Sequence, residues 1–325
     1  MKYRTLPGTD LQLSAIVTGC WALGGEHWTP PVDDDAAART IARAWERGIT
    51  SFDTAPLYGR GRADARLRAG LGPRRREARI VTKVGPRWDT PGGHPRSDLS
   101  PANVRADVEG SLRRLDLDVL PLVLTHWADE GDTPIEATLG ALAELQAAGK
   151  IGRYGLCNAP PALLRRALEF APDLAALQTP YSLLRRDFEA ALRDLSGETG
   201  EDGRWRQRLG VLAYEPLARG LLARGGDAAP DFADDDLRSR DPRFAEPTWS
   251  RLQPLRAALQ TIAGRVDAPA AAIAIAWVLR QPGVSVCLVG ARSPAQIDEH
   301  VQALGLVGRD KIFAALEPYA RAARP

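Results

Sequence analysis

The sequence holds few of the residues that build cross-linked, metal-bound or membrane-spanning proteins. Its only cysteines, Cys20, Cys157 and Cys287, are far apart and form no Cys-x-x-Cys pair, so we expect neither a disulfide framework nor a zinc site. The longest apolar stretch, Ala268 to Leu279, is far shorter than the roughly 20 residues that span a bilayer. The amino terminus lacks the apolar run of a secretory signal. These absences predict a soluble, cytoplasmic protein with no membrane partner and no bound metal.

The chain also lacks an excess of charge of either sign. Lysine and arginine number 43 against 41 acidic residues, which leaves a net charge of +2. So small a charge creates no field that would attract nucleic acid or anionic lipid, so the expected partner is a small molecule. Apolar residues make up 44% of the chain, enough for a sizeable core. Because α/β barrels commonly reach 325 residues as one domain, we expect residues 1–325 to form a single domain.

Short apolar segments alternate with segments of helical character along the chain. The predicted strands are Ala15–Gly19, Ile49–Phe52, Arg79–Thr82, Val119–Leu124, Tyr154–Cys157, Leu174–Gln178, Gly210–Tyr214 and Val284–Gly290. The predicted helices between them include Asp33–Arg47, Asp64–Ala69, Pro101–Leu115 and Pro134–Ala148. Eight strands in this alternation favour an α/β fold, a (β/α)8 TIM barrel. We expect extra helices and loops toward its C-terminus.

Two segments stand outside the alternation. Residues Arg4 to Ile16 hold two short apolar runs around a Pro-Gly-Thr-Asp turn, which predicts a β-hairpin before the first barrel strand. Residues Gly225 to Pro247 form a long irregular stretch with several acidic residues, glycines and prolines. Stretches of this length and composition are typical of a lid over a site or of a mobile loop.

Polar side chains follow the predicted strands at the end where a barrel carries its active site. Asp53 and His126 directly follow two of the strands, Lys83 continues a third, and Tyr58 lies shortly after Asp53. A buried amine needs a charged or polar partner, and Asp53 on the neighbouring strand is available to Lys83. The later strands are followed by Asn158, Gln178, Tyr214 and the run Gly290-Ala291-Arg292-Ser293.

Each of these residues has an ordinary structural explanation when it is taken alone. Asp53 is able to cap a turn, Tyr58 to pack in a loop, and His126 to bond at the barrel rim, while Lys83 is able to extend its amine to solvent. Their occurrence in order on neighbouring strands favours a catalytic set instead. An acid, a phenol, an amine and an imidazole that meet at one place are suited to protonate a carbonyl oxygen.

Several motifs along nearly the whole chain resemble the aldo-keto reductase superfamily, in particular its bacterial branch with short loops. These motifs are Phe52-Asp53-Thr54-Ala55-Pro56-Leu57-Tyr58-Gly59, Thr82-Lys83-Val84-Gly85, Thr125-His126-Trp127, Gly149-Lys150-Ile151-Gly152-Arg153-Tyr154-Gly155, Gln178-Thr179-Pro180-Tyr181-Ser182-Leu183-Leu184-Arg185, Tyr214-Glu215-Pro216-Leu217-Ala218-Arg219-Gly220 and Val289-Gly290-Ala291-Arg292. The resemblance implies a barrel that binds NADP(H) across its mouth without a Rossmann domain. The lack of a Gly-x-Gly-x-x-Gly motif after any predicted strand agrees with this.

The resemblance also implies a reaction and four catalytic roles. Hydride from NADPH, or from NADH as the second choice, reduces an aldehyde or ketone, with sugars among the candidates. Tyr58 is then the proton donor and Lys83 the cation that tunes it, because a phenol with a pKa of about 10 is a poor acid near neutrality unless a cation stabilises the phenolate. Asp53 holds the lysine charged, and His126 polarises the carbonyl.

The same resemblance implies the cofactor residues, and several of them depart from the family pattern. Cys157 stands where serine is usual, Glu215 where a small hydroxyl residue is usual, Gln296 where many relatives carry arginine, and His300 where asparagine is common. We expect Arg219 to pair with Glu215, and Arg292 to bind a 2′-phosphate without help. The complete expected set is Cys157, Asn158, Gln178, Tyr214, Glu215, Leu217, Arg219, Gly290, Arg292, Gln296, Glu299 and His300.

The substrate pocket is indicated by tryptophans in the loops at the barrel mouth. Trp21, Trp28, Trp88 and Trp127 follow predicted strands and are expected to wall the pocket, although tryptophans also cover barrel-end backbone. The charged residues of the mouth loops are a second candidate surface, suited to a sugar or an anionic group. They are Glu26, His27, Arg60, Arg62 and Arg87.

Three other functions use the same residues. The same groups serve oxidation of an aldose or alcohol, in which Tyr58 acts as the base. A non-catalytic NADPH sensor or interaction subunit would bind the cofactor without turnover. A Schiff-base aldolase would use Lys83 as a nucleophile and need no nicotinamide. An acid and a phenol beside the amine suit a tuned proton donor better than an imine-forming lysine.

Overall fold

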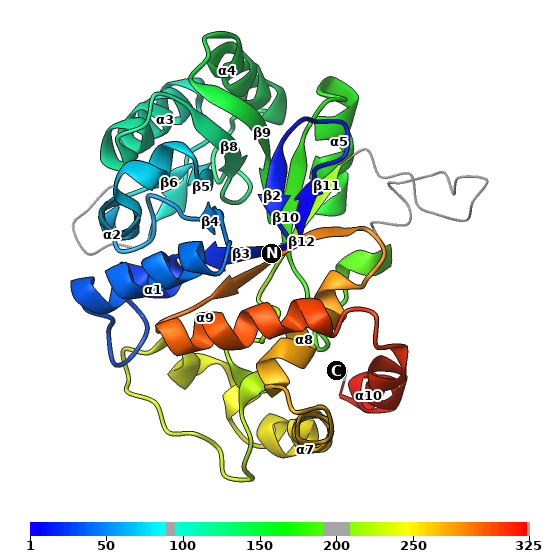
Figure 1. The fold of residues 1–325 in the computed structure, drawn as a ribbon. Helices are drawn as coiled ribbons and strands as arrows, with labels where there is room; N and C mark the ends of the chain where they lie inside the picture. The colour runs from blue at the N-terminus through cyan, green and yellow to red at the C-terminus, as the bar shows by residue number, and fades with distance from the viewer. Residues whose placement is uncertain (89–94, 191–208, 324–325) are drawn as a thin grey trace.

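Eight parallel strands close into a barrel in the computed structural model, which describes residues 1–88, 95–190 and 209–323 (Figure 1). Around the barrel the strands follow the order β10-β11-β12-β3-β4-β5-β8-β9. Their bounds are β3 Ile16–Gly19, β4 Ser51–Asp53, β5 Arg79–Val84, β8 Leu120–Thr125, β9 Ile151–Cys157, β10 Ala176–Pro180, β11 Gly210–Tyr214 and β12 Val284–Gly290. The predicted (β/α)8 barrel is thereby confirmed, and every predicted strand overlaps an observed one.

The barrel strands are apolar on both faces because each face is covered. In β5, Val81 points into the barrel core while Ile80 packs against the surrounding helices. In β8, Leu122 and Leu124 face the barrel core and Val123 faces outward. Successive side chains of a strand point to opposite faces, so a strand buried on both sides reads as a continuous apolar run. This explains why the strands were visible in the sequence.

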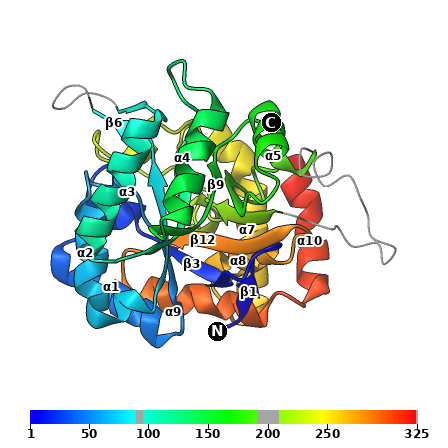
Figure 2. The same cartoon turned by 90° about the horizontal axis from the view of Figure 1, so that it is seen from above.

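The helices surround the barrel in both views (Figures 1 and 2). They are α1 Asp34–Glu46, α2 Arg62–Leu71, α3 Pro101–Leu115, α4 Ile135–Ala147, α5 Pro161–Phe170, α7 Thr248–Val266, α8 Ala270–Leu279, α9 Pro294–Val301 and α10 Asp310–Ala322. Two helices begin at side-chain caps: the Asp33 side chain accepts the Ala36 N–H at 2.6 Å, and Ser100 caps α3 at Asn103. Shorter elements are the 3₁₀ turns η1 Trp21–Gly24, η2 Gly72–Arg76, η3 Leu221–Ala223, η4 Leu237–Arg240, η5 Pro242–Phe244 and η6 Gln302–Gly305, and the two-residue strands β6 Pro86–Arg87 and β7 Arg96–Ser97.

The predicted N-terminal hairpin closes one end of the barrel. Its strands, β1 Tyr3–Thr5 and β2 Gln12–Ser14, pair antiparallel, and the N-terminus lies over the centre of the barrel in Figure 1. Leu6, Leu11 and Leu13 are part of the barrel core. The Arg4 guanidinium donates to the carbonyl oxygens of Leu279, Val284 and Ser285, at 3.0 to 3.1 Å. The other end of the barrel is thus left for the functional site.

Helix α8 is apolar on every side because every side is buried. It packs between β12, α7 and α9, and all of its residues are buried. In the described part of the chain, no single helix is long and apolar enough to span a membrane. Helices α7 and α8 pass that test only when joined, and they meet at a bend of 99°.

The irregular segment from Gly225 to Pro247 is tied to the loop that follows β3. The Asp236 carboxylate accepts from the backbone N–H of Thr29 at 2.8 Å and from its hydroxyl at 2.9 Å. The backbone N–H of Leu237 donates to the carbonyl oxygen of His27 at 3.0 Å. The segment therefore lies against the loop over residues 27–29 and forms one wall of the barrel mouth.

Candidate active site

A cavity of about 570 Å³ lies at the C-terminal ends of the barrel strands. This volume falls within the range of small-molecule and cofactor sites. All of the residues expected to bind the cofactor border it: Cys157, Asn158, Gln178, Tyr214, Glu215, Leu217, Arg219, Gly290, Arg292, Gln296, Glu299 and His300. Asp53, Tyr58 and His126 border it as well. Lys83 lies behind them in the barrel wall, with 1% of its side chain exposed.

Lys83 joins Asp53 and Tyr58 in one hydrogen-bonded chain. Its ammonium lies 2.8 Å from both carboxylate oxygens of Asp53 and 3.1 Å from the phenol oxygen of Tyr58. It also donates to the carbonyl oxygen of Thr54 at 3.1 Å. Strands β4 and β5 pair in parallel with Asp53 opposite Val81, so Lys83, two residues further along β5, reaches Asp53 at the end of the barrel. The predicted pairing of the buried amine with Asp53 is present.

The protonation states of Lys83 and Tyr58 are set by burial and by their hydrogen-bond partners. Burial opposes the charge of Lys83, but the Asp53 carboxylate outweighs it and raises the pKa of the amine above its ordinary value. Burial raises the pKa of the Tyr58 phenol, while the Lys83 cation acts in the opposite direction without cancelling that effect. Tyr58 is therefore protonated near neutrality and lies beside a permanent cation.

Tyr58 is fixed by a close contact between two glycines. Gly59 has a φ of 60°, in the left-handed region, and a Cβ on it would lie 2.2 Å from the carbonyl oxygen of Gly24. A Cβ on Gly24 would lie 2.9 Å from the backbone of Tyr58 and Gly59. The Tyr58 ring stacks on Trp21 at a centroid distance of 6.2 Å and meets His126 edge-on at 5.8 Å. The phenol is thus held by its backbone and by two neighbouring rings.

His126 follows β8, and its backbone N–H donates to the carbonyl oxygen of Val84 at 2.9 Å. Burial and the nearby Lys83 cation hold the pKa of its imidazole well below the usual range. The ring is neutral, so it offers one N–H donor and one acceptor nitrogen. Its Nδ1 is buried without a partner among the described residues.

The amides of Asn158 and Gln178 lie next to the catalytic candidates. Asn158 donates to the carbonyl oxygen of His126 at 3.0 Å and accepts from the Tyr214 hydroxyl at 2.8 Å. Gln178 donates to Asp53 at 2.7 Å. The Cys157 sulfur lies 3.3 Å from the amide oxygen of Gln178, and because burial raises the pKa of this thiol to about 12, it keeps its proton and donates.

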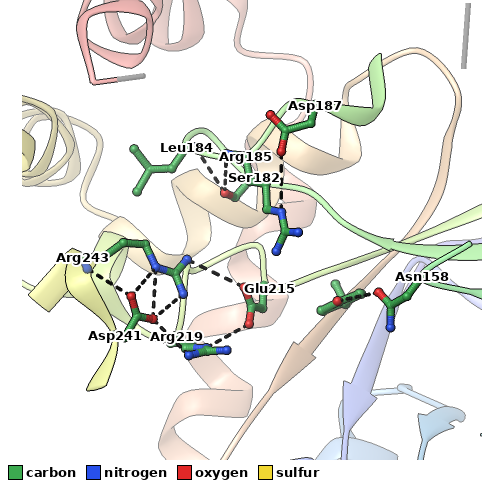
Figure 3. Close-up of polar contacts among 10 residues, drawn as sticks. Asn158, Ser182, Leu184, Arg185, Asp187, Glu215, Arg219, Asp241 and Arg243 are labelled. Atoms are coloured by element: carbon green, nitrogen blue, oxygen red, sulfur yellow. Dashed lines mark hydrogen bonds and ion pairs between the residues drawn. The ribbon is translucent and has the colours of Figure 1, made fainter. Parts of the chain in front are cut away.

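The negative charge of Glu215 is compensated by two arginines (Figure 3). Arg219 donates to one oxygen of Glu215 at 3.0 Å, as the sequence predicts, and Arg243 lies 3.7 Å from the other. Asp241 binds both arginines, at 3.1 Å from Arg219 and 2.6 Å from Arg243. Glu215, Ala218 and Arg219 all have positive φ, so the loop after β11 is tightly wound at the cavity. The carboxylate is held toward the protein rather than left free.

Arg292 and His300 border the far end of the cavity. The Arg292 guanidinium donates to the carbonyl oxygens of Thr29 and Pro30, and its backbone N–H donates to the side chain of Gln296 at 2.8 Å. Its Nε is buried without a partner among the described residues. Burial lowers the pKa of His300 to about 4, so this ring is neutral, and its Nδ1 is also without a partner in the described part of the chain.

Three of the four expected pocket tryptophans border the cavity, namely Trp21, Trp28 and Trp127. Trp21 and Trp28 meet edge to face at a centroid distance of 5.5 Å. The fourth, Trp88, does not border it, and the guanidinium of Arg60 lies 5.4 Å from the centre of its ring. The structure thus does not bring Trp88 to the pocket, because its loop turns the ring toward Arg60.

The charged mouth-loop residues considered for substrate binding do not border the cavity either. Those residues are Glu26, His27, Arg60, Arg62 and Arg87. The arginines that do border it beside Arg219 and Arg292 are Arg224 and Arg238, which the sequence did not single out. Arg238 pairs with Asp236 at 2.6 Å and lies 5.1 Å from the centre of the Trp28 ring. The acidic residues around Asp236 are evident in the sequence, but nothing in the sequence places them beside residues 27–29.

The comparisons with known proteins agree with this geometry. The model of the aldo/keto reductase family matches residues 15–319. The chain is 30% identical to Aldo-keto reductase YhdN of Bacillus subtilis, over 92% of this chain and 87% of that protein. It is 31% identical to the NADH-specific methylglyoxal reductase of Escherichia coli, over 94% of each. Among solved structures, a glycerol dehydrogenase from Gluconobacter oxydans is similar with a TM-score of 0.86 and 33% identity, covering 98% of this chain and 94% of that one.

Proposed function

This chain is an oxidoreductase of the aldo/keto reductase family, and we propose that it interconverts the carbonyl and alcohol forms of a small molecule with a nicotinamide cofactor. The observation that carries the proposal is the Asp53–Lys83–Tyr58 chain at the wall of the cavity. It ends at a protonated phenol, beside a neutral imidazole that offers a second hydrogen bond. These are the groups that carbonyl reduction needs.

In reduction, Tyr58 gives its proton to the oxygen that becomes the alcohol. The phenolate left behind is stabilised by the Lys83 ammonium, which already contacts the phenol oxygen at 3.1 Å. Asp53 keeps that ammonium charged and in place. His126 donates its N–H to the same substrate oxygen and shares the developing charge. The bound nicotinamide supplies the hydride. In the oxidative direction, Tyr58 takes the proton from the alcohol.

The residues around the cavity fit a dinucleotide. Asn158 and Gln178 keep a spare N–H for the carboxamide after their protein contacts, and Tyr214 offers an aromatic face for the nicotinamide ring. At the far end, Nε of Arg292 and Nδ1 of His300 have no partner among the described residues and are suited to bind a polar ligand. Buried polar atoms without partners are costly, and a bound adenosine end would satisfy them.

The choice between NADPH and NADH depends on the far end of the cavity. The resemblance implies NADPH, yet the Arg292 guanidinium already donates to two backbone carbonyls, Gln296 is uncharged, and Glu299 adds a carboxylate. A 2′-phosphate needs strong cationic partners. We therefore propose that both cofactors bind and that NADH is used more efficiently, in the manner that the name of the Escherichia coli relative states for that protein.

The substrate is proposed to be a small aldehyde, ketoaldehyde or polyol-derived carbonyl. The pocket wall of Trp21, Trp28 and Trp127 is apolar, and the named relatives include a methylglyoxal reductase and a glycerol dehydrogenase. The aldolase alternative is disfavoured by the state of Lys83. An amine whose pKa is raised by Asp53 and whose protons are engaged with Asp53, Thr54 and Tyr58 is a poor nucleophile.

The test is consumption of NADH and NADPH, followed by absorbance, over a panel of methylglyoxal, aliphatic and aromatic aldehydes and open-chain sugars, with glycerol for oxidation. Turnover is expected with at least one substrate and a higher kcat/KM with NADH. Tyr58→Phe should lower kcat by about 10²- to 10⁴-fold with cofactor affinity retained. A Tyr58→Phe protein as active as the wild type would contradict the proposed proton donor. Tight dinucleotide binding without any turnover would favour the sensor function instead.

A further inference from the structure

The hydrogen bond between Gln178 and Asp53 crosses the interior of the barrel. Asp53 ends β4 and Gln178 lies in β10, and these two strands stand opposite each other in the closed order of eight. The Gln178 amide nitrogen donates to the Asp53 carboxylate at 2.7 Å. The two residues are 2% and 4% exposed, so the bond is shielded from water. Lys83 contacts the same carboxylate oxygen, Oδ2, from the neighbouring strand β5, so the carboxylate is held both from beside it and from across the barrel.

The orientation of the Gln178 amide follows from its two partners. A carboxylate accepts hydrogen bonds only, so the nitrogen end of the amide must face Asp53. The oxygen end then faces the Cys157 thiol at 3.3 Å, which is a donor because it keeps its proton. The amide is therefore held from both ends, and each end still has one hydrogen-bonding position to spare.

We propose that Gln178 is a positioning residue for the proton donor: its amide holds the Asp53 carboxylate in the orientation that directs the Lys83 ammonium at Tyr58. This inference rests on the proposed function. Lys83 has three protons, and its contacts are the two Asp53 oxygens, the Thr54 carbonyl and the Tyr58 oxygen. If Asp53 turned, the ammonium would follow its strongest partner away from Tyr58.

The bond also affects how readily Tyr58 loses its proton. Burial raises the pKa of Tyr58, the Lys83 cation lowers it, and the Asp53 charge raises it. Gln178 disperses part of the Asp53 charge by donating to it. Without that donor, the full carboxylate charge acts on Tyr58 and the phenol holds its proton more tightly. Because Gln178 also borders the cavity, the same side chain links cofactor binding to proton transfer.

Two substitutions separate this role from simple cofactor binding. Gln178→Met keeps the volume and removes the donor, and we expect kcat to fall roughly 10- to 100-fold, as for a catalytic group displaced by about 1 Å. Gln178→Glu donates like glutamine while it is protonated and repels Asp53 once it is ionised. The activity of Gln178→Glu relative to Gln178→Met should therefore rise as the pH is lowered.

The control is Asn158→Ala. Asn158 borders the same cavity, and in the described part of the chain its side chain bonds to His126 and Tyr214 rather than to Asp53, so its loss should weaken dinucleotide binding and leave the pH profile of kcat unchanged. If Gln178→Met raised only the cofactor Kd and kept the wild-type kcat and pH profile, the positioning role would be overturned.

A second readout does not depend on turnover. The side-chain ammonium resonance of Lys83 is observed by NMR of ¹⁵N-lysine-labelled protein and assigned by its loss in Lys83→Met. We expect it to shift and to exchange faster with water in Gln178→Met, because the cage around the ammonium loosens. An unchanged resonance would overturn the inference, whereas lack of turnover in the wild type would overturn only the proposed function.

Discussion

At the scale of single residues, the position of Tyr58 depends on the contact between Gly24 and Gly59. Gly59→Ala would require a left-handed backbone, which costs roughly 1–2 kcal/mol for an ordinary residue. It would also place a methyl group 2.2 Å from the Gly24 carbonyl oxygen, so the loop that carries Tyr58 must move. We expect lower stability to urea and a kcat reduced by at least about tenfold.

Gly149→Ala is a matched control for this substitution. Gly149 has a φ of 73°, also positive, but a Cβ there would meet no atom within 4 Å. It should therefore show the backbone cost alone, with kcat unchanged. Equal values of kcat in the two variants would show that the glycine contact does not position the phenol.

Residues at strand ends were predictable, and residues farther along the connecting loops were predictable only in part. Asp53, Lys83 and His126 follow directly from the strands that precede them, and the barrel brings such ends together. Trp88 follows its strand by a longer connection, and the orientation of a side chain in such a connection depends on neighbours such as Arg60 that sequence order does not show. For the same reason, the sequence did not indicate that Arg238 borders the cavity.

At the scale of elements, the segment Gly225–Pro247 and the loop after β3 are joined by Asp236. Hydrogen bonds from Thr29 and Arg238 outweigh burial and hold the pKa of Asp236 below its ordinary value, so the carboxylate stays charged near neutrality. In the sequence the segment reads as a lid or a mobile loop, because its composition shows no period. The partner that orders it lies some 200 residues earlier in the chain.

Asp236→Ala should loosen this wall of the cavity. It removes the acceptor of both Thr29 bonds and leaves Arg238 buried without its partner, which for a buried pair costs about 3–5 kcal/mol. We expect a lower melting temperature, weaker dinucleotide binding, and faster hydrogen exchange in residues 225–247. Asp235→Ala removes an exposed neighbour and should change none of these. If the two variants had the same exchange rates, Asp236 would not be what holds the segment.

At the scale of the whole molecule, the barrel was predictable because burial on both faces leaves a strong mark in the sequence. Each strand appears as a short apolar run. The start of a helix, such as Ser100 before Pro101, lies between two of these runs. The order of strands around the barrel then follows from the rule that successive parallel strands lie next to each other. The pattern does not determine the lengths of the helices: α2, Arg62–Leu71, extends beyond the predicted range Asp64–Ala69 at both ends.

The stability of the whole fold should also depend on two aspartates near the end of β5. Asp107 accepts the backbone N–H of Gly85 at 2.7 Å, and burial, opposed by this bond and by Arg114, raises its pKa to about 6. Nearby, hydrogen bonds from Ser100 and Arg87 lower the pKa of Asp98. The two carboxylates therefore have opposite effects on the dependence of stability on pH.

Asp107→Asn is expected to stabilise the protein at pH 7 to 8 by about 1–3 kcal/mol, because a carboxylate whose pKa is raised from 3.8 to about 6 destabilises the fold once it is ionised. An asparagine oxygen still accepts the Gly85 N–H, so that bond is kept. The gain should shrink as the pH falls from 6 toward 4, where the wild-type folded protein takes up a proton. Asp98→Asn should show the reverse: a loss near neutrality that disappears at acidic pH. The measurement is urea unfolding of both variants and the wild type from pH 4 to pH 8. A constant difference between Asp107→Asn and the wild type over this range would show that Asp107 does not ionise within it in the folded protein.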